Sequence, residues 1–306
     1  MGRFHAAKVE ALARSDGGVA LVGIADVDAE RAASVAAEAA VPHATRAADL
    51  FPGADAAIVA VPTIAHLAVV REALRAGLDV LVEKPIAATV EEAETLLDLA
   101  RTLGRVLQVG HLENFNSAMR GLPDRIRRPR FVEAHRLGPF PERGTDVDVV
   151  RDLMIHDLEI IQQLVGEEPE RVEAIGVPVL TDCVDIANAR VAFPGGCVAN
   201  LTASRVSPTP MRKIRIFQAN AYFSIDFIEQ RLVIFRRERG APGARPEIRM
   251  EKLAMDREDA LLAQLRDFVD AVRTRRAPRV SGERALSALR TALRVIDAIP
   301  PIDEPL

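Results

Sequence analysis

The chain has 306 residues, a net charge of −4, 49% hydrophobic residues and 27% charged residues. This length exceeds what one hydrophobic core usually supports, so we expect two domains. Acidic and basic residues are mixed along the chain, which argues against nucleic acid or a charged membrane surface as a partner. Because no apolar run reaches the ~20 residues of a membrane span and no signal-peptide pattern opens the chain, we expect a cytoplasmic protein.

The first stretch has the order of a nucleotide-binding unit. A helix-type run, Ala6–Ala13, precedes a strand-type run, Val19–Ala25, which ends at Asp26 before a second helix, Ala29–Ala39. In such units a glycine-rich turn opens the first helix, and an acid about 20 residues later binds the adenosine ribose. Asp26 stands 24 residues after Gly2, which fits if Gly2 is the third glycine of this fingerprint.

On that alignment the first strand and the first two fingerprint glycines are missing. The first strand normally lies in the middle of the parallel sheet, so its loss would leave two neighbouring strands unpaired. We expect that the natural chain starts about ten or more residues upstream of Met1, enough for a strand and a turn. A real truncation is the alternative, and the sequence does not separate the two.

Strands and helices alternate through the next hundred residues. Pro62, Lys84 and His111 follow directly after strand-type runs, as Asp26 does. The alternation predicts an α/β fold with a Rossmann-type doubly wound parallel sheet, whose ligands gather at the carboxyl ends of the strands. The predicted strands are Ala56–Val61, Leu78–Val82 and Val106–Val109, and the predicted helices are His66–Ala76 and Val90–Leu103, the latter capped by Thr89 with Glu92.

The composition changes after Leu122, and we therefore predict domains at residues 1–122 and 123–306. Closely spaced strand-type runs predict a second, α+β domain with an open, mostly antiparallel sheet, including a hairpin at Pro194-Gly195-Gly196. We assign two C-terminal helices to this domain. The predicted strands are Phe131–Leu137, Arg171–Leu180, Asp185–Phe193, Cys197–Val206, Lys213–Gln218, Ala221–Phe227 and Arg231–Arg236, and the helices are Asp256–Arg273 and Glu283–Ile299.

One helix of the second domain, Asp148–Gly166, carries a pair of chemically suited side chains. Asp152 and His156 are four residues apart, on the side opposite an apolar stripe formed by Val147, Val150, Met154, Leu158, Ile161 and Val165. A histidine beside a carboxylate suits a general base that removes a hydroxyl proton. A structural histidine in a local ion pair is the alternative.

Two cysteines, Cys183 and Cys197, have neither the spacing of metal ligands nor that of a disulfide framework. We therefore expect two buried thiols and no metal site.

Several motifs together resemble the Gfo/Idh/MocA oxidoreductases. They are Gly2-Arg3-Phe4-His5, Asp26, Pro62 with His66, Glu83-Lys84-Pro85, Gly110-His111 with Phe115-Asn116, and Asp152 with His156. The resemblance covers nearly the whole chain. It implies a dehydrogenase of sugars or related alcohols, with its site in the cleft between a Rossmann domain and an open-sheet domain.

The resemblance also implies roles for individual residues. Lys84, Asp152 and His156 would be catalytic, and a lysine at a strand end can stabilise the oxygen as charge develops on it. Cofactor would be bound by Gly2, Arg3, Asp26, Pro62, His66, Glu83 and Lys84, and substrate by His111, Asn116, Arg136 and Arg143. NAD is expected rather than NADP, because Asp26 would repel a 2′-phosphate. Alternatives stay open: Lys84 could be a surface lysine paired with Glu83, and His66 and His111 could only cap the backbone.

The segments His135–Phe140, Arg143–Val150 and Leu153–Asp157 resemble one branch of that family, whose members oxidise the 3-hydroxyl of a UDP-amino sugar. A diphosphate substrate needs arginines, and Arg136, Arg143 and Arg205 are the nearest candidates to the dyad. Surface charge is the alternative for each.

The sequence therefore predicts an NAD-dependent oxidoreductase of a sugar or nucleotide-sugar hydroxyl. Two other interpretations stay open: a non-catalytic, truncated product that cannot hold cofactor, and a family reductase of another small carbonyl compound. We also expect a homo-oligomer formed through the open sheet.

Overall fold

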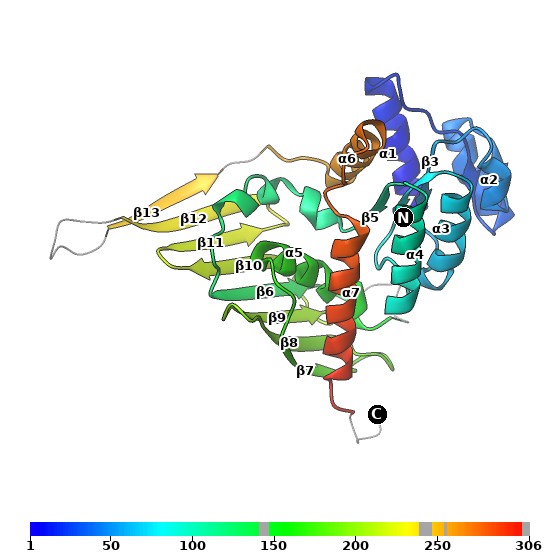
Figure 1. Ribbon diagram of the computed structural model, residues 1–306. Coiled ribbons are helices and arrows are strands. Elements are labelled where there is room, and N and C mark those ends of the chain that lie inside the picture. Colours follow the sequence, from blue (N-terminus) through cyan, green and yellow to red (C-terminus); the bar gives the residue numbers. More distant parts are fainter. Residues whose placement is uncertain (141–146, 239–246, 254–255, 302–306) are drawn as a thin grey trace. The chain divides into compact units, whose positions relative to one another are not determined.

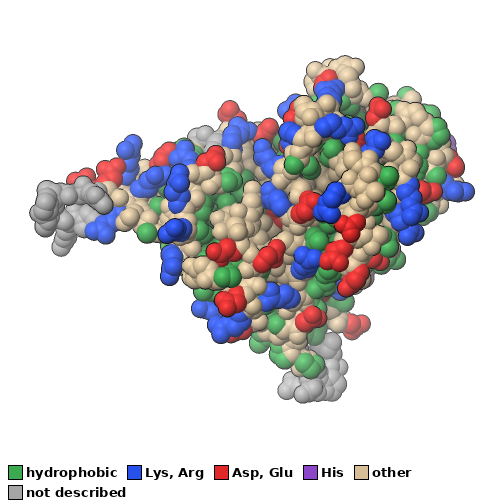
Figure 2. All heavy atoms as spheres, viewed as in Figure 1, with side chains coloured by type: hydrophobic (Ala, Val, Ile, Leu, Met, Phe, Trp, Pro, Cys, Tyr) green, Lys and Arg blue, Asp and Glu red, His purple; other side chains and the backbone are tan. Residues whose placement is uncertain are grey.

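The computed structural model describes residues 1–140, 147–238, 247–253 and 256–301, which form two compact units. Unit 1 comprises Met1–Phe115 and Asp259–Leu286, and unit 2 comprises Asn116–Glu258 and Ser287–Leu306. Lysine and arginine side chains are interspersed with acidic ones on the face shown in Figure 2. Among the described residues, no helix has both the length and the apolarity needed to cross a bilayer.

Unit 1 contains parallel strands that alternate with helices (Figure 1). Its strands are β1 (Ile24–Ala25), β2 (His43–Ala44), β3 (Ala56–Val59), β4 (Asp79–Val82) and β5 (Leu107–Val109). Its helices are α1 (Gly2–Ser15), α2 (Ala29–Ala39), α3 (His66–Arg75), α4 (Val90–Thr102) and α6 (Ala260–Thr274). This confirms the predicted doubly wound parallel class.

The parallel strands of unit 1 form two separate ladders. β1 pairs with β2, and β3, β4 and β5 form the second ladder, with no described hydrogen bond joining the two. The long strand predicted at Val19–Ala25 is reduced to two residues, and β3 is only partly buried where β4 is fully buried. A strand stabilised on one edge only has half of its backbone groups unpaired, which explains the shortening.

Helices cover both faces of the β3–β5 ladder. On one face, Leu81 of β4 packs with Val9 and Leu12 of α1 and with Leu265 and Phe268 of α6. On the other, α3 and α4 pack together, and Thr89 caps α4 by accepting from the Glu92 backbone N–H at 3.2 Å, as the capping motif predicts.

The position of α6 differs from the predicted division of the chain. The sequence pattern places both C-terminal helices in residues 123–306, but Asp259–Leu286 belongs to unit 1, and the first boundary falls at Phe115 rather than Leu122. The physical reason is the apolar stripe of α6, which is buried against α1 and β4. When a chain forms a second domain and then returns to the first, the composition of the returning segment does not show which domain it packs in.

Unit 2 is built on one eight-stranded sheet in the order β13-β12-β11-β10-β6-β9-β8-β7 (Figure 1). All neighbours are antiparallel except β6 and β9, which confirms an open, mostly antiparallel sheet. The strands are β6 (Phe131–Leu137), β7 (Arg171–Val177), β8 (Ile186–Ala192), β9 (Val198–Ser204), β10 (Met211–Gln218), β11 (Ala221–Asp226), β12 (Arg231–Glu238) and β13 (Glu247–Leu253). The prediction omitted β13.

One face of this sheet is covered by α5 (Ile155–Val165) and by the part of α7 (Gly282–Asp297) that lies in unit 2. Val132, Leu201 and Ile214 from the sheet contact Leu158 of α5 and Ala292 of α7 in one apolar cluster. Alternation along each strand directs every second side chain away from these helices, so the other face is left for solvent or a partner.

Candidate functional site

In unit 1, the loop after β4 is held from two sides. The Nε2 atom of His5 lies 2.7 Å from Oε1 of Glu83, and His5 is 2% exposed. The second carboxylate oxygen, Oε2, accepts from the backbone N–H of Lys84 at 3.3 Å. The hydrogen bond with His5 of α1 therefore fixes the side chain of Glu83, the residue that precedes Lys84.

Gly110 and His66 complete this support. A Cβ at Gly110 would lie 2.8 Å from Oε2 of Glu83, so only glycine leaves room for the carboxylate. The ring nitrogens of His66, which is 1% exposed, face the carbonyl oxygens of Pro85 at 2.9 Å and Val61 at 3.0 Å. This geometry favours the backbone-capping interpretation of His66, because both nitrogens are used by the chain.

Helix α1 begins at Gly2, the residue that the sequence pattern assigns to the glycine-rich turn. A Cβ on Gly2 would have nothing within 4 Å, and the first turn contains no acidic side chain and no side-chain cap. Unpaired N–H groups and the helix dipole favour a phosphate at such an end. Arg3 lies exposed beside it and pairs with Glu38 of α2 (Nε to Oε2, 3.1 Å).

Asp26 follows β1 and is 31% exposed. Its Oδ1 accepts from the Asp28 backbone N–H at 3.0 Å, and its Oδ2 pairs with Nε of Arg31 at 3.0 Å. Two apolar side chains are largely exposed at strand ends of the same unit, Val27 at 90% and Ile64 at 85%. A carboxylate, an arginine and apolar surface are the groups that contact the ribose and adenine of a dinucleotide.

In unit 2, the dyad helix does not start as a regular α-helix. Val150–Met154 forms a π-helical turn that contains Asp152, and α5 continues from Ile155 with His156 as its second residue. Such turns are rare and are frequent at functional sites. A π-turn holds more residues than an α-turn, so Asp152 lies at a different angle from His156 than the predicted regular helix would give.

The predicted apolar stripe of this helix is confirmed at Val150, Met154, Leu158 and Ile161, which are 0 to 2% exposed. Asp152 and His156 are half-buried. The stripe against the sheet core fixes the helix, and the two polar side chains keep partial access.

Arg136 of β6 and Asp157 of α5 form a buried ion pair that the sequence pattern did not indicate. Nε and Nη2 of Arg136 donate to the two carboxylate oxygens at 3.0 and 2.8 Å, and both residues are 3% exposed. The ion pair therefore holds the guanidinium of Arg136 against Asp157, the residue that follows His156. A substrate role of Arg136, which stays a prediction, would use a cation already held in place.

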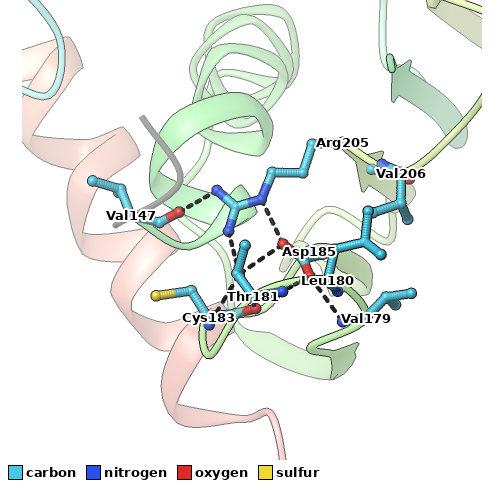
Figure 3. A network of polar contacts seen from close by, with 9 residues as sticks. Val147, Val179, Leu180, Thr181, Cys183, Asp185, Arg205 and Val206 are labelled. Atoms are coloured by element: carbon cyan, nitrogen blue, oxygen red, sulfur yellow. Dashed lines mark hydrogen bonds and ion pairs between the residues drawn. The ribbon is translucent and has the colours of Figure 1, made fainter. Parts of the chain in front are cut away.

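Arg205 is 1% exposed, and each of its three guanidinium nitrogens donates to a group of unit 2. It is therefore not available to a diphosphate, and that candidate role is wrong. The charge is taken up by Asp185 and by neighbouring backbone (Figure 3).

The remaining predicted substrate residues are His111, Asn116 and Arg143. His111 is 1% exposed, and Asn116 is 6% exposed, with Nδ2 donating to the Phe227 carbonyl at 2.9 Å and Oδ1 accepting from the Ala118 N–H. Arg143 lies outside the described residues. Asn116 thus has backbone partners within unit 2.

Both cysteines are free thiols, Cys197 buried and Cys183 half-buried. Burial, and secondarily Glu167, raises the pKa of the Cys197 thiol to about 11, so it is protonated at neutral pH. Within the described ranges, no cluster of three or more His, Cys, Asp and Glu could hold a metal ion.

Sequence reasoning missed three supporting residues. His5 belongs to the Gly2-Arg3-Phe4-His5 motif, but its contact with Glu83 spans 78 positions. Asp157 and Asp185 pair with Arg136 and Arg205, which lie 21 and 20 positions away in the sequence. His5 and Asp157 stood in motifs that the sequence analysis quoted, but neither motif indicated the partner, and Asp185 stood in none.

A doubly wound parallel unit followed by a large open sheet, with a carboxylate and a histidine on the helix that covers the sheet, is an arrangement found in NAD(P)-dependent dehydrogenases of CH–OH groups. Residues 1–111 match the oxidoreductase family with an NAD-binding Rossmann fold, and residues 124–224 match the GFO/IDH/MocA C-terminal domain. The chain belongs to the Gfo/Idh/MocA oxidoreductase family.

Within this family, the chain is similar to the following enzymes. UDP-N-acetylglucosamine 3-dehydrogenase of Acidithiobacillus ferrooxidans is 39% identical over 300 residues, covering 98% of this chain and 94% of that enzyme. A solved structure of that enzyme superposes with a TM-score of 0.90 at 38% identity, covering 98% of this chain and 94% of the other. A myo-inositol dehydrogenase of Streptomyces leeuwenhoekii is 33% identical over 206 residues, covering 60% of this chain and 62% of that enzyme.

Proposed function

We propose that this enzyme oxidises the 3-hydroxyl of a UDP-amino sugar and transfers the hydride to NAD. The observation that carries the proposal is the 39% identity over 98% of the chain to a UDP-N-acetylglucosamine 3-dehydrogenase. The geometry of unit 2 supports it, because a half-buried histidine follows a carboxylate on a fixed helix.

In this proposal His156 accepts the hydroxyl proton, and Asp152 orients and charges the imidazole. Lys84 provides the positive charge that stabilises the oxygen as the carbonyl forms. The supports described above serve these roles: His5 and Glu83 hold the loop of Lys84, and the apolar stripe holds the helix of His156. Lys84 belongs to unit 1, and Asp152 and His156 belong to unit 2, so substitutions in one unit test each role separately.

The described residues of unit 1 fit a dinucleotide. The N-terminus of α1 at Gly2 would take the pyrophosphate, and Asp26 would accept from the adenosine ribose hydroxyls. Val27 and Ile64 offer apolar surface, and His66 holds the backbone at Val61 and Pro85. When bound, NAD supplies a hydride acceptor, and the protein supplies binding and orientation.

We propose NAD as the preferred cofactor, with NADP the weaker one. Asp26 would repel a 2′-phosphate, but Arg31, 3.0 Å away, is the type of residue that accepts one. The variant Asp26→Ser should therefore lose at least about tenfold in NAD affinity and gain NADP affinity. Isothermal titration of both cofactors measures this, with Asp28→Ser as the neighbouring control. Tighter NADP than NAD binding by the unaltered protein would remove Asp26 from this role.

A non-catalytic product that cannot hold cofactor is the second candidate. A dehydrogenase of another polyol or small carbonyl compound is the third, in line with the inositol dehydrogenase relative. A panel of UDP-sugars, free amino sugars and inositols, assayed for NADH formation, separates the three. Fastest turnover of UDP-N-acetylglucosamine supports the leading proposal. Fastest turnover of inositol favours the third. Failure to bind NAD or NADP, together with no NADH formation from any substrate, favours the second.

We also propose a homo-oligomer in which a second copy covers the outward face of the unit 2 sheet, in a cytoplasmic enzyme. A row of apolar side chains crosses five strands in register on that face: Phe131, Phe217, Tyr222, Phe235 and Met250. The rings of Phe217 and Tyr222 stack at 4.7 Å, and Tyr222 and Phe235 at 5.3 Å. Apolar patches of this kind mark interfaces.

Tyr222→Glu places a charge in the centre of this row and is expected to convert the oligomer to monomer at micromolar concentration, because an unpaired charge in an interface is costly. Analytical ultracentrifugation reads the outcome. Asp98→Lys, on the exposed side of α4 in unit 1, is the charge-change control. A monomeric unaltered protein, or an unchanged oligomer in Tyr222→Glu, would contradict the proposed interface.

A further inference from the structure

Arg205 and Asp185 form the centre of a buried polar cluster in unit 2 (Figure 3). Nε of Arg205 donates to Oδ1 of Asp185 at 2.6 Å, and the residues are 1% and 0% exposed. Nη2 of Arg205 donates to Oγ1 of Thr181 at 3.0 Å. We call Arg205, Asp185 and Thr181 the Arg205 cluster.

The carboxylate of Asp185 is fully supplied with donors. Its Oδ2 accepts from the backbone N–H groups of Val179, Leu180 and Thr181 at 2.8, 2.6 and 2.9 Å, and its Oδ1 also accepts from Oγ1 of Thr181 at 2.9 Å. Burial raises the pKa of Asp185, but these hydrogen bonds and the one from Arg205 outweigh it and lower that pKa. The anion therefore persists at neutral pH and holds the guanidinium in one orientation.

The third nitrogen of Arg205 reaches the start of the dyad helix. Its Nη1 donates to the carbonyl oxygen of Val147 at 2.6 Å. Two residues later, the N–H of Val149 donates to the carbonyl of Val184, the neighbour of Asp185, at 2.9 Å. The chain is thus attached to the cluster immediately before the π-turn Val150–Met154.

Between these two attachments, Asp148 binds Arg151, the second residue of the π-turn. Its Oδ1 accepts from the Arg151 backbone N–H at 2.9 Å, and its Oδ2 pairs with Nε of Arg151 at 2.5 Å. Three consecutive residues that precede Val150 are therefore fixed by polar contacts. A π-turn is less regular than an α-turn, so its geometry depends on how its first residues are held.

We propose that Arg205 is a positioning residue, which sets the π-turn through the Val147 carbonyl and thereby the angle between Asp152 and His156. The inference rests on the proposed function, in which this pair takes the hydroxyl proton. A purely structural role would need only a group that fills the space. A buried guanidinium has a large desolvation cost, and a directional bond to one carbonyl is what a hydrocarbon cannot replace.

The control is Arg294, an exposed arginine that donates from Nη1 and Nη2 to the carbonyls of Pro169 and Glu170 at 2.6 and 2.9 Å. It is also an arginine-to-carbonyl clamp of unit 2, but it holds the start of β7 instead of the dyad helix. Arg205→Met and Arg294→Met should both lower the melting temperature. Only Arg205→Met should lower kcat by about 10²-fold, with KM for the sugar changed less than about threefold, since misplacement of reacting groups acts on the transition state.

Two milder variants keep the test informative if Arg205→Met does not fold. Arg205→Lys retains the charge but has one nitrogen instead of three, so it cannot reach the same three acceptors in the planar guanidinium geometry. Thr181→Val removes the hydroxyl that joins Arg205 to Asp185. Both should lower kcat in the same direction by about three- to thirtyfold. Equal kcat losses in the Arg205 and Arg294 variants at matched stability would overturn the inference.

Hydrogen exchange provides a readout that does not need a substrate. Amides in the peptide Val149–His156 should exchange at least about tenfold faster in Arg205→Met than in the unaltered protein. In Arg294→Met the exchange rates of the same amides should be unchanged. If no sugar were oxidised, the proposed function would fail while this measurement still decided whether Arg205 sets the helix start. Unchanged exchange in every Arg205 and Thr181 variant would overturn the inference on its own.

Discussion

Replacing His156 by alanine is expected to lower kcat by about 10²- to 10⁴-fold, the usual cost of losing a general base. NAD affinity should stay within about twofold, because His156 belongs to unit 2 and the fingerprint residues belong to unit 1. Steady-state rates across pH, with NAD affinity measured separately by titration, test both parts. Gln163→Ala, on the same helix, is the control for helix stability.

Asp152→Asn extends this experiment. A smaller loss than for His156→Ala is expected if the carboxylate only orients and charges the imidazole, and an equal loss if it takes the proton itself. Wild-type turnover of His156→Ala at every pH would contradict the dyad and leave a structural histidine in a fixed helix.

Lys84→Met is expected to lower kcat by about 10²- to 10³-fold, the cost of removing one group that stabilises a developing oxyanion. NAD binding should also weaken, because Lys84 lies on the loop that Glu83 and His66 hold in the nucleotide-binding unit. Lys84→Arg keeps the charge but changes its geometry and should recover little of the rate.

Lys8→Met is the control for Lys84, since Lys8 pairs with Asp259 on the surface of unit 1. Unchanged kcat and NAD affinity in Lys84→Met would favour the alternative that Lys84 is a surface lysine. A loss of NAD affinity without a loss of kcat would restrict it to cofactor binding.

The parts of the fold that follow from local pattern were predicted correctly. Helix α2 has the predicted bounds Ala29–Ala39, and the hairpin at Pro194-Gly195-Gly196 joins antiparallel β8 and β9, with Gly196 at a positive φ. The stripe of the dyad helix is buried as its spacing requires. Apolar periodicity and turn residues act over a few positions, and a single sequence contains that information.

What the sequence did not predict depends on distant partners. Helix α6 returns to unit 1 because of Leu265 and Phe268, which contact Leu81 nearly two hundred positions earlier. The π-turn at Val150–Met154 has no sequence signature, and its start is held by Arg205, which the sequence suggested as a phosphate ligand. An arginine near a candidate site looks the same in sequence whether it binds substrate or a buried aspartate.

The proposed reaction is tested most directly with UDP-N-acetylglucosamine that carries deuterium at C3. The proposal predicts that the purified enzyme produces deuterated NADH and that turnover of this substrate is slower than that of the unlabelled one whenever hydride transfer limits the rate. NADH without deuterium would show that the hydride comes from another carbon, and no NADH from any nucleotide sugar would contradict the proposed function.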